Sequence, residues 1–350
     1  MTTWIALLLA DPSPCLRRRV LTELLGRTDA DPEVHELGLR VADPLAAELV
    51  ALQQEDGSWR PSDLPGNAGG RVLATAHVLA RLGYLGLRSD HPAVARGAEY
   101  LFAQQRADGA WPLPEEREAG EGREGYAMIP LQTALPLRGL AACGYAEDPR
   151  AERAYEWLLA RRLPDGAWPT GIAGVGREAA SGVFGSVAGY RRLARSRWGC
   201  RSNTTGALLA LGEHPTRRTG AEARRALDLL LGRETRERAD VGFEVARLIG
   251  AEPPRGFLTF FARYDLGLIL SLCARVGAST DDPRVADLVA FVRGLQGPYG
   301  LWEYGPHPQA SRWVTFDLLR SLARLDAGGA WIGLEPRTPF QPYPSRRKRY

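Results

Sequence analysis

The chain has 350 residues, of which 45 are lysine or arginine and 41 are acidic, so its formal net charge is only +4. This near balance lacks the basic excess that nucleic-acid-binding domains carry, so we expect no nucleic acid as a partner. Four widely spaced cysteines without a Cys-x-x-Cys pair favour a reduced, cytoplasmic chain over a disulfide framework.

Residues 1–43 are predicted to form an N-terminal helical region. The apolar run from Trp4 to Ala10 has neither the basic flank nor the cleavage site of a signal peptide, and no apolar stretch approaches the ~20 residues of a membrane span. Two helices follow, Cys15–Leu25 and Pro32–Val41. Asp31 before Pro32 is typical of an N-cap followed by proline at the first helical position. We expect this helical pair to pack beside the first repeat of the region that follows.

A sequence motif made of a helix, a tight turn and a tryptophan recurs along residues 44–330. Its clearest copy is Arg96–Trp111, where Asp108 and Gly109 form the turn, and other copies end at Trp59, Trp168 and Trp302. The segment Arg224–Glu234 keeps the helix but has lost the tryptophan. A repeated unit with two apolar helical segments predicts a closed or solenoidal helical array.

Each repeat is predicted to pair an outer helix with an inner helix. The predicted outer helices are Pro44–Gln54, Pro92–Arg106, Pro149–Arg162, Ala221–Arg233 and Pro283–Leu295. The predicted inner helices are Arg71–Leu82, Tyr126–Cys143, Asn203–Leu211, Leu258–Val276 and Ser311–Leu325, with a short extra helix at Phe243–Ile249. The linker 169–202 is long enough to predict a functional or mobile loop, and the proline-rich basic tail, 331–350, predicts disorder.

These repeats resemble those of the terpenoid cyclase and protein prenyltransferase superfamily, including squalene cyclases, over roughly residues 44–326. The family's QW repeat is matched best by Arg96, Gly97, Tyr100, Gln104, Gly109 and Trp111. The resemblance implies an all-α fold, an α/α toroid in which outer helices surround inner helices that line an apolar cavity. It also implies a structural role, tying the outer helices together, for Gln54, Trp59, Gln104, Trp111, Trp168 and Trp302.

The acid and metal motifs of that superfamily are not matched. The pair Asp281-Asp282 superficially resembles a magnesium motif, but it precedes a proline and an apolar helix, as Asp43 and Asp148 do, which indicates helix N-caps. We find no Asp-x-Asp-Asp acid. Asp265 and Cys273 are too far apart to match the Asp-x-Cys pair of a zinc site. We therefore expect neither magnesium nor zinc as a cofactor.

The expected starts of the inner helices suggest a site at one rim of a closed ring. Converging helix N-termini favour an anion, so a diphosphate or carboxylate head group is predicted there, with an apolar tail in the cavity. Arg71 and the arginine run that ends at Arg201 are candidates to complete this site, although that run is equally explained as a solvated loop. The remaining positions near this rim are Gln132, Cys200, Asp265 and Val314.

Asp265 is the candidate general acid, because burial among apolar residues raises the pKa of a carboxyl group. The alternative is a structural carboxylate that pairs with an arginine. Phe261, Tyr264, Trp313 and Phe316 are candidates to line the cavity and stabilise cationic intermediates, while aromatic core packing gives the same pattern. His77 is added as a substrate-binding candidate, against the simpler interpretation of a core histidine.

The leading functional hypothesis is a terpene cyclase-like or prenyltransferase-like protein that acts on an isoprenoid or another apolar small molecule. The main alternative is a non-catalytic toroid that binds a lipid or a protein partner. A toroid that acts on glycans is a third alternative. The sequence argues against it, because no pair of carboxylates in one groove is evident. The basic tail allows at most a peripheral membrane contact.

Overall fold

The protein is all-α over the part of the chain that its structure, a computed structural model, describes. The described residues are 4–39, 43–64, 70–111, 130–169, 199–232, 241–253 and 265–327. Within them an isolated bridge pairs Pro169 with Gly199. None of the helices in these ranges is long and apolar enough to cross a membrane. The predicted fold class is confirmed.

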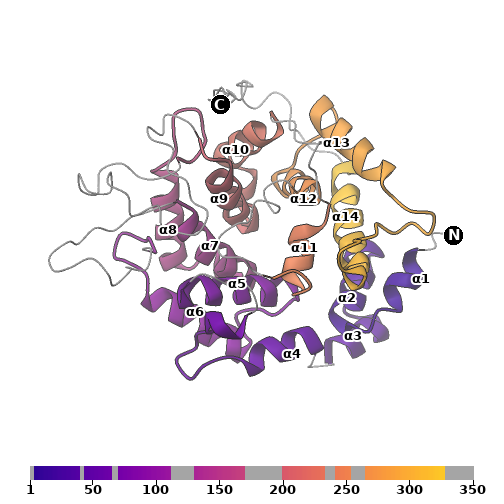
Figure 1. Ribbon diagram of the computed structural model, residues 1–350, viewed down its shortest axis with the longest axis horizontal. Helices are drawn as coiled ribbons and strands as arrows, with labels where there is room; N and C mark the ends of the chain where they lie inside the picture. The colour runs from indigo at the N-terminus through magenta and orange to yellow at the C-terminus, as the bar shows by residue number, and fades with distance from the viewer. Residues whose placement is uncertain are drawn as a thin grey trace, which may run out of the picture.

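Two layers of helices form a ring (Figure 1). The outer helices are α4 (Pro44–Ala51), α6 (Pro92–Ala103), α8 (Pro149–Leu159), α10 (Ala221–Leu231) and α13 (Pro283–Gly294). The inner helices are α5 (Arg71–Tyr84), α7 (Pro130–Leu140), α9 (Arg201–Glu213), α12 (Leu266–Val276) and α14 (Ser311–Asp326), and each packs against the next. The short helix α11 (Phe243–Leu248) lies inside this ring and contacts α5, α12 and α14. This arrangement is the expected α/α toroid.

The N-terminal helices contact both the first and the last inner helix. They are α1 (Trp4–Leu9), α2 (Pro14–Arg19) with a π-helical turn at Val20–Leu24, and α3 (Pro32–Leu39). Arg19 donates a hydrogen bond to the backbone carbonyl of Tyr84 on α5 at 2.8 Å, while Glu23 accepts one from Arg320 on α14 at 3.4 Å. Helix α1 was not expected from the sequence, because its apolar run is short.

Aspartate caps start three of the outer helices. Asp43, Asp148 and Asp282 each accept a hydrogen bond from the backbone N–H two residues further on, and each is followed by proline at the first helical position. These geometries confirm the cap interpretation of the Asp-Pro pairs. In the second repeat His91 takes the same position, and its Nδ1 accepts from the Ala93 N–H at 3.2 Å.

Each repeat tryptophan is fixed at both its indole and its backbone. In the second repeat, Trp111 Nε1 donates to the Leu101 carbonyl at 2.8 Å, and the Trp111 N–H donates to Thr133 Oγ1 on the next inner helix at 3.2 Å. The same two bonds recur at Trp59 with Thr75, at Trp168 with Thr204 and at Trp302 with Thr315. The tryptophan therefore joins the outer helix of its own repeat to the inner helix.

The glutamines that link neighbouring repeats are Gln53 and Gln105, not the expected Gln54 and Gln104. Gln105 Nε2 donates to the Gly109 carbonyl at 2.9 Å and to the Arg150 carbonyl at the start of α8 at 3.0 Å. Gln53 makes the equivalent pair of bonds in the first repeat. The expected residues are wrong by one position because the outer helices end early: Gln104 is the C-cap of α6 and Gln54 lies in the turn after α4.

The turn glycine lets one repeat approach the next closely. Gly109 has a φ of +95°, and a Cβ atom at this position would lie 2.5 Å from the Arg153 carbonyl oxygen on α8. Both features require glycine. In the last repeat, a Cβ atom at Gly300 would instead lie 3.2 Å from Trp4 of α1. Helix α1 thus occupies the place that a following outer helix takes elsewhere.

Candidate functional site

Charged side chains of α5, α7 and α11 meet inside the ring and form what we call the interior cluster: His77, Arg81, Arg138, Glu244 and Arg247. Glu244 lies at its centre and accepts from Arg138 Nη1 at 2.6 Å and from Arg247 Nη1 at 2.8 Å. All three side chains are buried. Burial alone would raise the pKa of Glu244, but the charges of Arg247 and Arg138 hold it below its ordinary value. The two arginines thus keep this carboxylate ionised.

Arg81 belongs to the same cluster but has no carboxylate of its own. Its side chain is buried, and Nε donates to the Leu248 carbonyl at 3.0 Å. The guanidinium lies against the backbone of Gly250, where a Cβ atom would come within 2.2 Å of Nη2. No carboxylate in the described ranges lies within ion-pair distance of it. Burial lowers the pKa of Arg81 to about 10, so the side chain remains charged at neutral pH.

His77 is a neutral member of the interior cluster. Burial lowers its pKa well below the ordinary value, and the charges of Arg247, Arg81 and Arg138 lower it further. Its Nε2 atom is buried and has no hydrogen-bond partner in the described part of the chain. The simpler expectation of a satisfied core histidine is therefore not met.

Asp265 lies next to the cluster, where it caps the N-terminal ends of two helices. It is fully buried and is the N-cap of α12, where Oδ1 accepts from the N–H groups of Gly267 and Leu268. Its oxygens also accept from the N–H groups of Gly242 and Glu244, which begin α11, at 2.9 and 2.7 Å. Burial raises the pKa of Asp265 to about 7, while these backbone donors oppose the rise. The observed contacts are those of a structural carboxylate, and its role as an acid stays a prediction.

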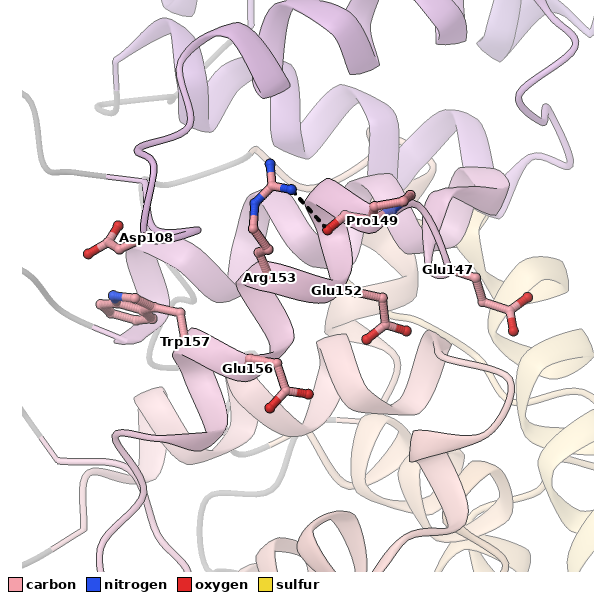
Figure 2. Close-up of a pocket in the computed structure, with 7 residues that line it drawn as sticks. All are labelled: Asp108, Glu147, Pro149, Glu152, Arg153, Glu156 and Trp157. Atoms are coloured by element: carbon pink, nitrogen blue, oxygen red, sulfur yellow. Dashed lines mark hydrogen bonds between the residues drawn. The ribbon is translucent and has the colours of Figure 1, made fainter.

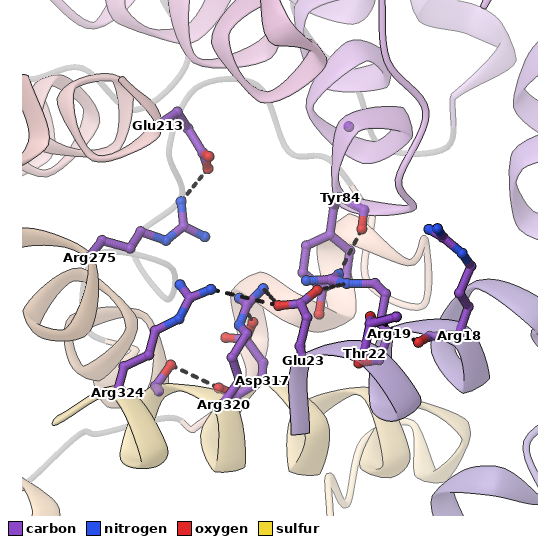
Figure 3. A network of polar contacts seen from close by, with 12 residues as sticks. Arg18, Arg19, Thr22, Glu23, Tyr84, Glu213, Arg275, Asp317, Arg320 and Arg324 are labelled. Carbon is purple, nitrogen blue, oxygen red and sulfur yellow. Dashed lines mark hydrogen bonds and ion pairs between the residues drawn. The ribbon is translucent and has the colours of Figure 1, made fainter. Parts of the chain in front are cut away.

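Figure 3 shows a second polar group, formed by the inner helices and the N-terminal helices. Glu213 at the C-terminal end of α9 pairs with Arg275 of α12, and Asp317 pairs with Arg320 in the middle of α14. Burial would raise the pKa of Glu213, but Arg275 and then Arg138 hold it below its ordinary value. Since Arg138 also binds Glu244, it electrostatically connects this group to the interior cluster.

The predicted N-terminal rim site is only partly described. Arg71 is the first residue of α5, half exposed, and pairs with Asp56 at 3.1 Å. Gln132 and Arg201 are buried near the starts of α7 and α9, and Cys200 is the N-cap residue of α9. The arginines between 191 and 197 lie outside the described residues. Anion binding at this rim stays a prediction.

Two of the four aromatic residues predicted to line the cavity lie in the described part of the chain. Phe261 and Tyr264 lie outside the described residues. Trp313 and Phe316 are buried at the start of α14, where the Trp313 ring lies 5.6 Å from the Tyr84 ring. Tyr84 and Arg71 are at opposite ends of α5, about 20 Å apart at 1.5 Å per residue. Trp313 therefore packs far from the rim at which Arg71 lies.

The interior arginines were missed because each looks like an isolated charge in an apolar helix. Arg81 and Arg138 share one sequence signal with Arg275 of the second polar group, a glycine one or two positions further on, near the end of an inner helix. It is visible at Arg81-Leu-Gly83, Arg138-Gly139 and Arg275-Val-Gly277. Cations near helix C-termini complement the helix dipole, which accounts for the pattern in part.

A shallow depression on the outer surface, over α8, is mainly acidic (Figure 2). It is lined by Asp108, Glu147, Pro149, Glu152, Arg153, Glu156 and Trp157. Glu152 is engaged by His214 at 2.9 Å and by Arg217 at 2.6 Å. These contacts tie α8 to the turn after α9, so the depression is explained by packing between repeats.

Fold and interior together define a class of protein: a helical toroid built from tryptophan-turn repeats. Residues 49–178 match the family model of the squalene-hopene cyclase C-terminal domain. A squalene–hopene cyclase from Bradyrhizobium diazoefficiens is 31% identical over 139 residues, which cover 39% of this chain and 20% of that protein. One from Zymomonas mobilis is 28% identical over 148 residues, covering 38% of this chain and 20% of that protein.

Residues 49–178 of this chain thus resemble squalene–hopene cyclases of the terpenoid cyclase superfamily. Its match spans a fifth of the length of the two squalene–hopene cyclases. The type II terpene cyclase MstE from Scytonema is a similar solved structure, with a TM-score of 0.47 and 21% identity over 80% of this chain and 70% of that one. The family-model match and the two squalene–hopene cyclases confirm the resemblance noted from the repeats, for the cyclase side of the superfamily.

Proposed function

We propose that this protein binds an isoprenoid or a similarly apolar small molecule inside its helical ring and performs a cyclase-like reaction on it. The observation that carries the proposal is the match of residues 49–178 to a squalene–hopene cyclase domain. That segment contains helices α5 and α7, which supply Arg81 and Arg138 to the interior cluster. Because the similar proteins are named cyclases, we give cyclisation precedence over prenyl transfer.

Asp265 is the residue on which catalysis would depend. A carboxyl group whose pKa is near 7 retains a proton at neutral pH, as a general acid must. The four backbone N–H donors around it favour the alternative, a non-catalytic carrier of the same ligand, because a protonated carboxyl group would face donors only. The two functions differ in whether a bound isoprenoid is converted.

Native mass spectrometry of the purified protein, with solvent extraction of any bound compound, tests both functions. The protein is then incubated with squalene and with farnesyl and geranylgeranyl substrates. A new product that requires Asp265, and whose rate falls as the pH rises through about 7, supports the enzyme. An isoprenoid recovered unchanged, with equal yield from Asp265→Asn, supports the carrier. An unliganded mass under all conditions contradicts both.

A further inference from the structure

The interior cluster contains more positive charge than the described side chains neutralise. Arg81, Arg138 and Arg247 contribute three positive charges, against the carboxylate of Glu244. Asp265 adds at most one negative charge inside the cluster, and Glu48, whose charge attracts Arg81, is exposed and forms no ion pair with it in the described part of the chain. A buried charge that is not paired is costly, and proteins retain one mainly where it has a function.

The cluster also contains buried polar atoms without hydrogen-bond partners in the described part of the chain. Arg247 Nε is buried and has no partner in the described ranges, and the same holds for His77 Nε2. Arg81 donates from Nε to the Leu248 carbonyl, and neither of its Nη atoms donates a hydrogen bond in the described part of the chain. Buried polar atoms are almost always hydrogen-bonded, so several such atoms in one place indicate an absent acceptor.

We propose that Arg81, Arg247 and His77 hold an oxyanion, a phosphate or carboxylate group, at one end of the ligand. The inference rests on the proposed function for the isoprenoid part of that ligand. An oxyanion supplies both missing elements: it neutralises the excess charge, and its several oxygens accept from the guanidinium groups. His77 contributes as a neutral donor through Nε2, in the tautomer that carries its proton there.

This site differs from the rim predicted from the sequence. The rim site uses Arg71 at the start of α5, whereas Arg81 lies in the last turn of the same helix. The two positions are about 15 Å apart along the helix axis. Substitution of one arginine therefore leaves the other site intact, and the two hypotheses can be separated.

The test is isothermal titration of the full chain with farnesyl diphosphate, farnesol and inorganic diphosphate. We expect the wild-type protein to bind farnesyl diphosphate at least tenfold more tightly than farnesol. Arg81→Gln should abolish this preference and Arg81→Lys should keep part of it. The matched control is Arg293→Gln, which removes a half-exposed arginine from the last turn of α13 and should change nothing.

The outcomes separate the inference from the function beneath it. Equal affinity of the wild-type protein for farnesol and farnesyl diphosphate overturns the oxyanion site and leaves isoprenoid binding standing. Binding of inorganic diphosphate that Arg81→Gln removes, without binding of either isoprenoid, supports the site and contradicts the proposed function. Loss of the preference in Arg71→Gln but not in Arg81→Gln assigns the anion to the rim. Should Arg81→Gln fail to fold by circular dichroism, Arg247→Gln replaces it with the same expected loss.

Discussion

Replacement of Arg81 by Met should make the ligand-free protein more stable. Burial lowers the pKa of Arg81 to about 10, well below the ordinary value of an arginine, and at ~1.4 kcal/mol per pKa unit the buried charge costs about 3 kcal/mol. At neutral pH the charge is present in the folded and unfolded chains, and the whole cost applies. Losing the hydrogen bond to the Leu248 carbonyl costs about 1 to 2 kcal/mol. The net gain in unfolding free energy should be about 1 to 2 kcal/mol.

Urea unfolding at pH 7, followed by circular dichroism, measures this difference between the wild-type protein and Arg81→Met. Methionine keeps the length and flexibility of the arginine stem, so packing changes little. Adding diphosphate should stabilise the wild-type protein alone, because only this form retains the unpaired guanidinium. A loss of about 3 to 5 kcal/mol in the variant, the value for breaking a buried ion pair, would refute the reasoning. Arg81 would then already be neutralised within the protein.

Three further substitutions test the framework around this site. Trp111→Phe leaves a buried carbonyl without its donor and should lower the unfolding free energy by about 1 to 3 kcal/mol in denaturant melts. Trp157→Phe is the matched control, because Trp157 Nε1 has no hydrogen-bond partner to lose within the described ranges. An equal loss of stability in both variants would contradict the role assigned to the Trp111 hydrogen bond. Glu244→Gln leaves two buried arginines unpaired and should cost about 3 to 5 kcal/mol. The pKa of Glu244 is lower in the folded than in the unfolded protein, so its carboxylate stabilises the fold fully above its unfolded pKa of ~4.3. This stabilisation is lost as the pH falls through the pKa of Glu244 in the folded protein. The melting temperatures of wild type and Glu244→Gln should therefore converge in acid. Gly109→Ala should cost about 1 to 3 kcal/mol, and an unchanged melting temperature would show that the turn can relax.

Local sequence patterns predicted the framework well. Asp148 before Pro149 identified the start of α8, and the repeated tryptophan identified the ring, because caps and turns depend on residues a few positions apart. The linking glutamine was assigned one position wrong, since the end of α6 decides whether Gln104 or Gln105 faces the next repeat. That detail depends on a contact with Arg150, more than forty residues away.

The interior was beyond prediction for a different reason. Whether Asp265 acts as an acid or as a cap depends on which backbone N–H groups approach it, and two of these belong to α11, more than twenty residues earlier. Arg81 has no local feature that separates it from an exposed helical arginine. The position of Arg81 in a buried charged cluster is evident only in the structure, where α5, α7 and α11 converge and the charges can be counted together.

The contact between Gly300 and Trp4 has a consequence for how the molecule comes apart. In an open array each unit touches only its neighbours, so unfolding can begin at a free end and advance one unit at a time. Here the last repeat rests on α1, and Arg19 and Glu23 connect the first inner helix to the last. Every repeat is therefore flanked on both sides. Loss of any one repeat deprives both of its neighbours, whether repeats or N-terminal helices, of a partner, which makes the ring a single cooperative unit.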